Sequence, residues 1–234
     1  MGYPSLPIGP LWKGALDGDG GPRRAIGRDL IQGVDVWKRR ALRRGASSLA
    51  VLAATTLAPL TTAAPAQAFC ATLYEWPGSF LYAKLGGAVP SGWTNAIKAS
   101  LNEWNNISGA NWTLQYTSGS EAAFAVRYDT PGVGFNGAPG VTVTQVNASN
   151  QVVGGDVYLN PNWSWNLNGN MNQANKVADV RTVTVHELGH ELVLDHPSLC
   201  GAMTTDETNA AMNPRYIQKW NINSDDRAGA AYMK

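Results

Sequence analysis

The sequence predicts an α+β domain in residues 69–234, because an amphipathic helix, several short alternating segments and a longer helix follow one another there. The first helix is expected at residues 92–107. Four apolar residues recur there at helical spacing and share one face, namely Trp93, Ile97, Leu101 and Trp104. Pro90-Ser91 supplies a start signal before this segment, and Ser108-Gly109 supplies a stop signal after it.

Alternating apolar and polar residues then predict the strands of one sheet, separated by clusters of Gly, Asn, Ser and Pro. The expected strands are residues 112–116, 123–128, 141–146 and 152–159. A long helix is expected at residues 172–193, where Val177, Val180 and Leu188 keep a helical period. Ser224 followed by two acidic residues predicts the N-cap of a last helix at residues 225–233.

Residues 1–68 are expected to be an N-terminal extension and signal peptide that is cleaved from the domain at residues 69–234. A basic run at residues 38–44 precedes an apolar stretch at residues 46–60, and Ala66-Gln67-Ala68 follows as a cleavage site. A membrane anchor is the alternative, but the apolar stretch is short and contains Ser and Thr. We therefore expect a secreted, extracellular protein that is not attached to a membrane after cleavage.

Charge argues against nucleic-acid binding. The whole chain carries a formal charge of +1, but residues 69–234 hold nine Lys or Arg against thirteen Asp or Glu. A net negative domain offers no electrostatic footprint for phosphate backbones. We expect the domain to be a monomer.

Two cysteines, Cys70 and Cys200, follow the expected cleavage site. An isolated pair in an exported protein typically forms a disulfide. A Cys70–Cys200 bond would tie the start of the mature chain to the segment just after His196.

The segment at residues 186–196 carries the chemistry. On a helix His186 and His190 lie one turn apart on the same face and can bind one Zn²⁺ together. Glu187 is turned away from a direct ligand position, which suits a general base acting on water. His196 would complete three histidine ligands with one open position, as in catalytic zinc sites. All three histidines of the chain fall on this pattern.

The pattern HExxHxxxxxH resembles the metzincin zinc metalloproteases, and its context resembles the secreted, bacterial-type matrixin branch. The resemblance covers most of residues 72–233. It implies a twisted mixed sheet with a long active-site helix and a C-terminal helix, and one catalytic zinc ion. It also implies hydrolysis of peptide bonds in a protein or peptide substrate, with Glu187 as general base. Residues 211–214 resemble the family's Met-turn, with Met212 beneath the zinc ion. Calcium occurs in the family, but no loop here has an EF-hand-like spacing.

The resemblance also implies a substrate site. Residues 156–160 are similar to the edge strand that lines the family's cleft, which makes Asp156, Tyr158 and Asn160 candidate substrate-binding residues. The pocket for the side chain after the scissile bond would be built by the segment at residues 214–220. Asp195 and Asp179 are candidates for supporting roles or salt bridges around the site. Glu191 is expected to be a solvated or supporting residue and not a catalytic one.

Three departures from the family pattern leave alternatives open. The sequence shows no pro-segment of the kind in which a cysteine blocks the zinc ion; Cys70 could do so, but a disulfide with Cys200 is favoured. Val193 stands where the family has Gly at a sharp turn, and a β-branched residue is strained at positive φ. Asp195 is therefore a fallback ligand for His196. Met203 competes with Met212 for the Met-turn, and Pro214 after it favours Met212.

Two other functions are considered as alternatives to a zinc endopeptidase. One is a catalytically weak or inactive secreted binding protein on the same zinc-binding fold, which Val193 favours and Glu187 disfavours. The other is a carbohydrate-binding module, indicated only by Trp163 and Trp165.

Overall fold

The computed structural model describes residues 24–29, 69–131, 134–135 and 137–233. The expected signal peptide, at residues 38–68, lies outside the described residues. Among the helices that are described, none is long and apolar enough to cross a membrane.

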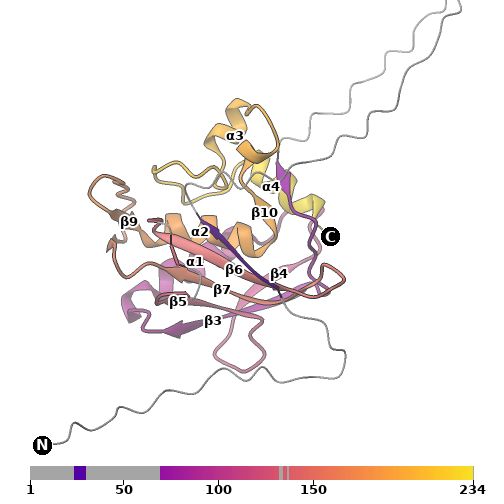
Figure 1. The fold of residues 1–234 in the computed structure, drawn as a ribbon, viewed down its shortest axis with the longest axis horizontal. Helices are drawn as coiled ribbons and strands as arrows, with labels where there is room; N and C mark the ends of the chain where they lie inside the picture. Colours follow the sequence, from indigo (N-terminus) through magenta and orange to yellow (C-terminus); the bar gives the residue numbers. More distant parts are fainter. Residues whose placement is uncertain (1–23, 30–68, 132–133, 136, 234) are drawn as a thin grey trace, which may run out of the picture.

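A six-stranded mixed sheet forms one layer of the molecule, in the order β1-β6-β7-β5-β3-β4 (Figure 1). Its central strands β7, β5 and β3, together with β4, run parallel, whereas β6 is antiparallel to both β7 and β1. The strands, in sheet order, are β1 (Arg24–Asp29), β6 (Gly140–Val146), β7 (Val152–Leu159), β5 (Phe124–Tyr128), β3 (Phe80–Gly87) and β4 (Thr113–Tyr116). The four predicted strands are confirmed within one residue at each end, and β1 and β3 were not predicted.

Two helices pack on one face of this sheet (Figure 1). The first begins with the 3₁₀ turn η1 (Ser91–Trp93) and continues as α1 (Thr94–Glu103). It ends before the predicted residue 107, because Asn105 turns its side chain to the backbone of Leu114 on β4 instead. The second, α2 (Val180–Glu191), lies against β6 and β7. The Trp104 indole donates to the carbonyl of Val185 over 2.9 Å and so joins the two helices.

The predicted helix at residues 172–193 is wrong in its first part. Residues 164–166 and 177–179 instead form the short parallel strands β8 (Ser164–Asn166) and β9 (Val177–Asp179). In the first part of the predicted helix the Asn172 side chain accepts the amide of Asn175, and the backbones of Asn172 and Val177 bond to each other over 2.9 Å, so these groups are not free for helical bonds. Asp179 then caps α2, accepting from the amide of Thr182 over 2.7 Å.

The chain beyond α2 returns to the start of the domain. β10 (Leu194–Asp195) pairs with β2 (Cys70–Ala71), and the 3₁₀ turn η2 (Pro197–Leu199) follows. Cys70 and Cys200 are joined by a disulfide, which confirms the predicted pairing. The C-terminal part contains α3 (Thr205–Asn209) and α4 (Ser224–Tyr232), and α4 confirms the predicted last helix.

The predicted edge strand is wrong. β7, which holds residues 156–159, lies inside the sheet between β5 and β6. Within the domain at residues 69–233, β6 is the strand at that edge, and β1 from the N-terminal extension pairs with its outer side. In β7 Val157 and Leu159 are buried and Tyr158 is half-buried, and such an alternation does not distinguish an interior strand from an edge strand.

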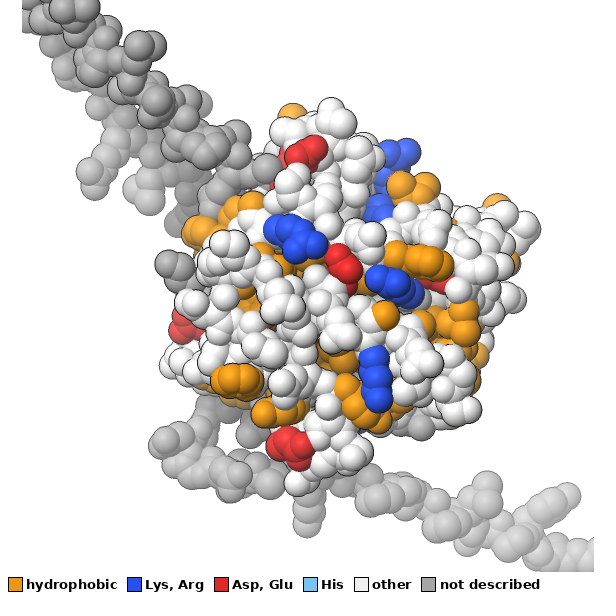
Figure 2. All heavy atoms as spheres, turned by 180° about the vertical axis from the view of Figure 1, so that it is seen from behind, with side chains coloured by type: hydrophobic (Ala, Val, Ile, Leu, Met, Phe, Trp, Pro, Cys, Tyr) orange, Lys and Arg blue, Asp and Glu red, His pale blue; other side chains and the backbone are white. Residues whose placement is uncertain are grey.

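Charged side chains are dispersed over the face seen in Figure 2. Lys and Arg side chains alternate with acidic ones there, and no single-sign patch gathers on the described part of this face. No histidine is visible on it either, so the histidine cluster does not open to this side.

Candidate zinc centre

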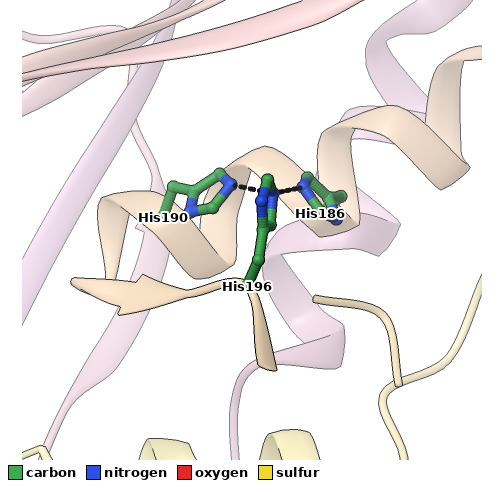
Figure 3. A group of neighbouring side chains, drawn as sticks. All are labelled: His186, His190 and His196. Atoms are coloured by element: carbon green, nitrogen blue, oxygen red, sulfur yellow. Dashed lines mark hydrogen bonds between the residues drawn. The ribbon is translucent and has the colours of Figure 1, made fainter. Parts of the chain in front are cut away.

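Three histidines converge from two elements of the structure (Figure 3). His186 and His190 project from one face of α2, and His196 follows β10. The Nε2 atom of His196 lies 3.1 Å from Nε2 of His186 and 3.1 Å from Nε2 of His190. A zinc ion bound at about 2.0–2.1 Å separates tetrahedral nitrogen ligands by about 3.4 Å, so small ring movements would accommodate it.

The second ring nitrogens fit a metal site as well. Nδ1 of His186 lies 2.6 Å from the carbonyl of Ala211, and Nδ1 of His190 lies 2.9 Å from the carbonyl of Leu194. A carbonyl can only accept, so each Nδ1 carries the proton and each Nε2 directs its lone pair at the shared point. The donor set therefore fits zinc, and these three histidines are the group that could hold an ion in the described structure.

Burial keeps this site in its metal-binding form. The pKa of His186 lies well below its usual value because burial disfavours the imidazolium, and the nearby His190 and His196 add to this effect. His186 is 3% exposed and His190 is 1% exposed. Neutral imidazole is the species that binds zinc, so protonation does not compete for His186 at neutral pH.

Glu187 lies on α2 next to His186, and a residue of the sheet holds its side chain in place. The hydroxyl of Thr142 on β6 lies 2.8 Å from both the carbonyl and Oε2 of Glu187, and donates its proton to one of them at a time. Gly140 makes room for this carboxylate, because a Cβ there would stand 2.8 Å from Oε1. The edge strand thus sets the position of the acid.

Val193 makes the turn that brings His196 to the site. It adopts φ of +62°, and its amide donates to the carbonyl of His190 over 2.9 Å. The β-branched side chain is strained in this region, but it is also buried in the core. β10 follows at once and is held by β2, so His196 reaches the site despite the missing Gly.

We expect the usual order of Ala and Gly to be reversed at position 193. Val193→Ala and Val193→Gly both lose the buried methyl groups, but only Gly relieves the positive φ, so the Gly variant should be more stable by about 1 kcal/mol. Urea unfolding of the two variants measures the difference. At the helical position Ala99, used as a control, replacement by Gly should instead cost about 1 kcal/mol. Equal stability of the two variants at position 193 would show that Val193 stores no strain.

Met212 lies beneath α2. A Cβ at Gly189 would stand 2.1 Å from its sulfur, so the absence of a side chain at Gly189 is what admits Met212. The carboxylate of Asp226 on α4 accepts from the amides of Ala211 and Met212 over 2.7 and 3.0 Å. The competing Met203 is 42% exposed and lies outside this packing.

Three acidic residues that the sequence analysis considered for the site make contacts outside the histidine group. Asp195 accepts from the amide of His196 over 3.0 Å, and it is not part of the histidine group. Asp179 caps α2 and also accepts from the Trp220 indole over 2.8 Å. Glu191 is fully buried against β7, where a Cβ at Gly155 would stand 2.5 Å from its Oε1.

The structure does not bring the candidate substrate residues to the histidines. Alternate residues of β7 face opposite sides of the sheet, and Val157 belongs to the core under the helices, so Asp156 and Tyr158 point to the other side. There Asp156 pairs with Arg127 on β5 over 2.8 Å. Asn160 is buried and donates to the carbonyl of Ala138, which anchors the segment before β6.

The two tryptophans behind the carbohydrate-binding alternative pack within the protein. Trp163 is 5% exposed and stacks on Tyr216, and Trp165 packs against Trp93. The Trp165 indole also donates to the carbonyl of Asn160 over 2.9 Å. This pair therefore forms no exposed platform for a sugar.

A small cavity lies beside His186. Its wall also contains Ala211, Asn213, Arg215 and Lys219. Arg215 and Lys219 belong to the segment at residues 214–220 that was expected to build a substrate pocket. The burial of Lys219, however, could not be predicted for a lysine in a polar loop.

A comparison with known protein families agrees with this geometry. The model of the matrixin peptidases matches residues 90–233, which is more than half of the chain. No curated protein matches the chain.

Proposed function

Since this chain belongs to the matrixin family, which uses catalytic zinc, we propose that it is a secreted zinc-dependent endopeptidase. The observation that carries the proposal is the convergence of three histidine Nε2 atoms. The Nε2 atom of His196 lies 3.1 Å from Nε2 of both His186 and His190, and the buried carboxylate of Glu187 belongs to the residue next to His186. The composition of residues 38–68 and the Cys70–Cys200 disulfide support secretion.

In the proposed mechanism Glu187 handles the proton. Zinc, when bound, supplies the Lewis-acid chemistry that polarises a carbonyl group and acidifies water. The Glu187 carboxylate accepts a proton from the attacking water and then delivers it to the leaving amine. Thr142 holds this carboxylate in place, and His186, His190 and His196 are the residues that would hold the ion.

The substrate is proposed to lie extended along the outer side of β6. Gly140 and Thr142 of this strand face Glu187, so a peptide paired with β6 would pass in front of the acid. An extended peptide adds to a sheet edge through main-chain hydrogen bonds. The pairing of β1 with residues 141–146 supports this, because it is itself a strand added to that side of β6.

We expect the N-terminal extension to slow cleavage. β1 occupies the side of β6 that the proposed substrate needs, so the full chain should cleave a peptide at least about tenfold more slowly than residues 69–234. Cleavage rates of the two proteins at equal concentration measure this. Placing proline at both Ile26 and Gly27 in the full chain removes an amide that faces β6 and should restore the rate. Equal rates for the two unsubstituted proteins would contradict the prediction.

The function is tested by digesting an unstructured protein, such as casein, with residues 69–234 and sequencing the new N-termini. Internal cleavage that stops with phenanthroline and returns with added zinc is the expected result. Secretion is tested separately by N-terminal sequencing of the protein in the culture medium, which should begin at Phe69.

A further inference from the structure

Lys219 is a buried cation that the proposed mechanism does not use. It is only 7% exposed, and its ammonium donates to the carbonyl of Asn213. Its amide also donates to the hydroxyl of Thr182 on α2 over 3.3 Å, which fixes the segment against the active-site helix. Within the described residues no carboxylate forms an ion pair with Lys219. A buried charge of this kind is costly unless an anion or a polar ligand meets it.

The cavity beside the zinc centre is where such a ligand could reach it. This cavity has both His186 and Lys219 in its wall, so one candidate metal ligand and the lysine border the same space. Its volume is about 10 Å³, which is room for about one water-sized group. A long apolar side chain would have to displace its walls, whereas a short polar one could enter.

We propose that Lys219 makes this cavity select a short acidic side chain, aspartate, at the residue that follows the scissile bond. The inference rests on the proposed peptidase function and names its substrate preference. One carboxylate oxygen fills the space of one water and accepts a charge-assisted hydrogen bond from the ammonium. Arg215, exposed at the rim of the same cavity, adds a second positive charge for the approaching acid.

The charge state of Lys219 agrees with this role. Burial lowers the pKa of Lys219 to about 8, the charge of Asp226 opposes the shift, and the charge of Arg215 adds to it. The ammonium is therefore still protonated at neutral pH. The carboxylate of Asp226 is already bonded by three backbone amides, from Ala211, Met212 and Asn223, and so does not replace a ligand for Lys219.

The test uses fluorogenic peptides that differ only in the residue after the scissile bond, with Asp, Asn, Glu or Leu there. For residues 69–234 we expect kcat/KM for Asp to exceed that for the isosteric Asn by about tenfold or more, because the ammonium then meets a carboxylate charge that Asn lacks. Asp should also exceed Glu and Leu. Lys219→Met should abolish the preference for Asp over Asn and improve cleavage of the Leu peptide. Lys98→Met removes the same charge outside the cavity and should leave the preference unchanged.

A binding measurement guards against a Lys219 variant that fails to fold. Glu187→Gln protein with Lys219 intact should bind the Asp peptide about tenfold more tightly than the Asn peptide, measured by fluorescence anisotropy. Equal kcat/KM and equal binding for the two peptides, or a wild-type preference for Leu, would overturn the proposal. Casein cleavage distinguishes failure of the peptidase function from failure of the proposed role of Lys219. If casein is cut and the peptides show no preference for Asp, only the role of Lys219 is contradicted. If casein is not cut, the peptidase function fails first.

Discussion

Replacing Glu187 by Gln is expected to lower kcat/KM for a peptide substrate by about 10²- to 10⁴-fold, the range that general acid–base catalysis contributes. Gln keeps the shape of the side chain and can still meet the Thr142 hydroxyl on β6, but it cannot take a proton from water. The ligands His186, His190 and His196 are unchanged, so zinc should remain at one ion per chain. Peptide kinetics and metal analysis on the same preparation measure both quantities.

The control for this variant is Glu75→Gln, which removes a carboxylate from an exposed position. Its kcat/KM should equal that of the unsubstituted protein. Loss of zinc from Glu187→Gln would mean that the variant damages the site instead of the proton transfer. Unchanged kinetics with zinc retained would assign the general base to another residue.

Replacing Glu191 by Gln is expected to stabilise the protein at alkaline pH. The Glu191 side chain is fully buried and neither carboxyl oxygen has a hydrogen-bond partner in the described structure. Burial raises the pKa of Glu191 to about 8, and the charge of Asp156 adds to this effect. At pH 8.5 the folded protein must hold a buried negative charge, and removing it should raise the free energy of unfolding by about 2 kcal/mol, or Tm by about 5 °C.

The sign of the pH dependence follows from the raised pKa. Below the unfolded value of 4.5 both states are protonated and Glu191 has no effect on stability. Between that value and about 8 the unfolded chain loses the proton that the folded chain keeps, so stability falls as pH rises through this window. The gain from Gln should therefore be large at pH 8.5 and nearly absent at pH 5. A gain that is the same at both pH values would contradict a buried ionisable acid at this position.

The zinc centre could be predicted from the sequence because its candidate ligands lie close together in the chain at a characteristic spacing. His186 and His190 are one helical turn apart, and any helix through them places both imidazoles together. His196 needed more than spacing, since β10 is placed by its pairing with β2, more than a hundred residues earlier in the chain. From the sequence alone, Val193 cast doubt on His196 as a ligand, because the family has Gly at that turn. The structure shows that the chain adopts the left-handed turn with valine in it.

The features that sequence reasoning missed depend on contacts between distant segments. Strand β3 pairs with β4 and β5 on either side, and its residues show no clear alternation of apolar and polar side chains. The edge of the sheet is decided by the order of strands, which the pattern of residues 156–159 cannot report. The early start predicted for helix α2 is wrong because Asn172 bonds instead to the amide of Asn175 and to the backbone of Val177. Lys219 is buried by the fold around α2 and not by its neighbours in sequence.

The most direct test of the zinc peptidase assignment is a titration of metal-free residues 69–234 with zinc while casein cleavage is followed. We predict that the rate rises in proportion to added zinc and reaches a plateau at one ion per chain. Casein that stays intact with one zinc ion bound per chain would contradict the assignment and favour a binding protein built on the same fold.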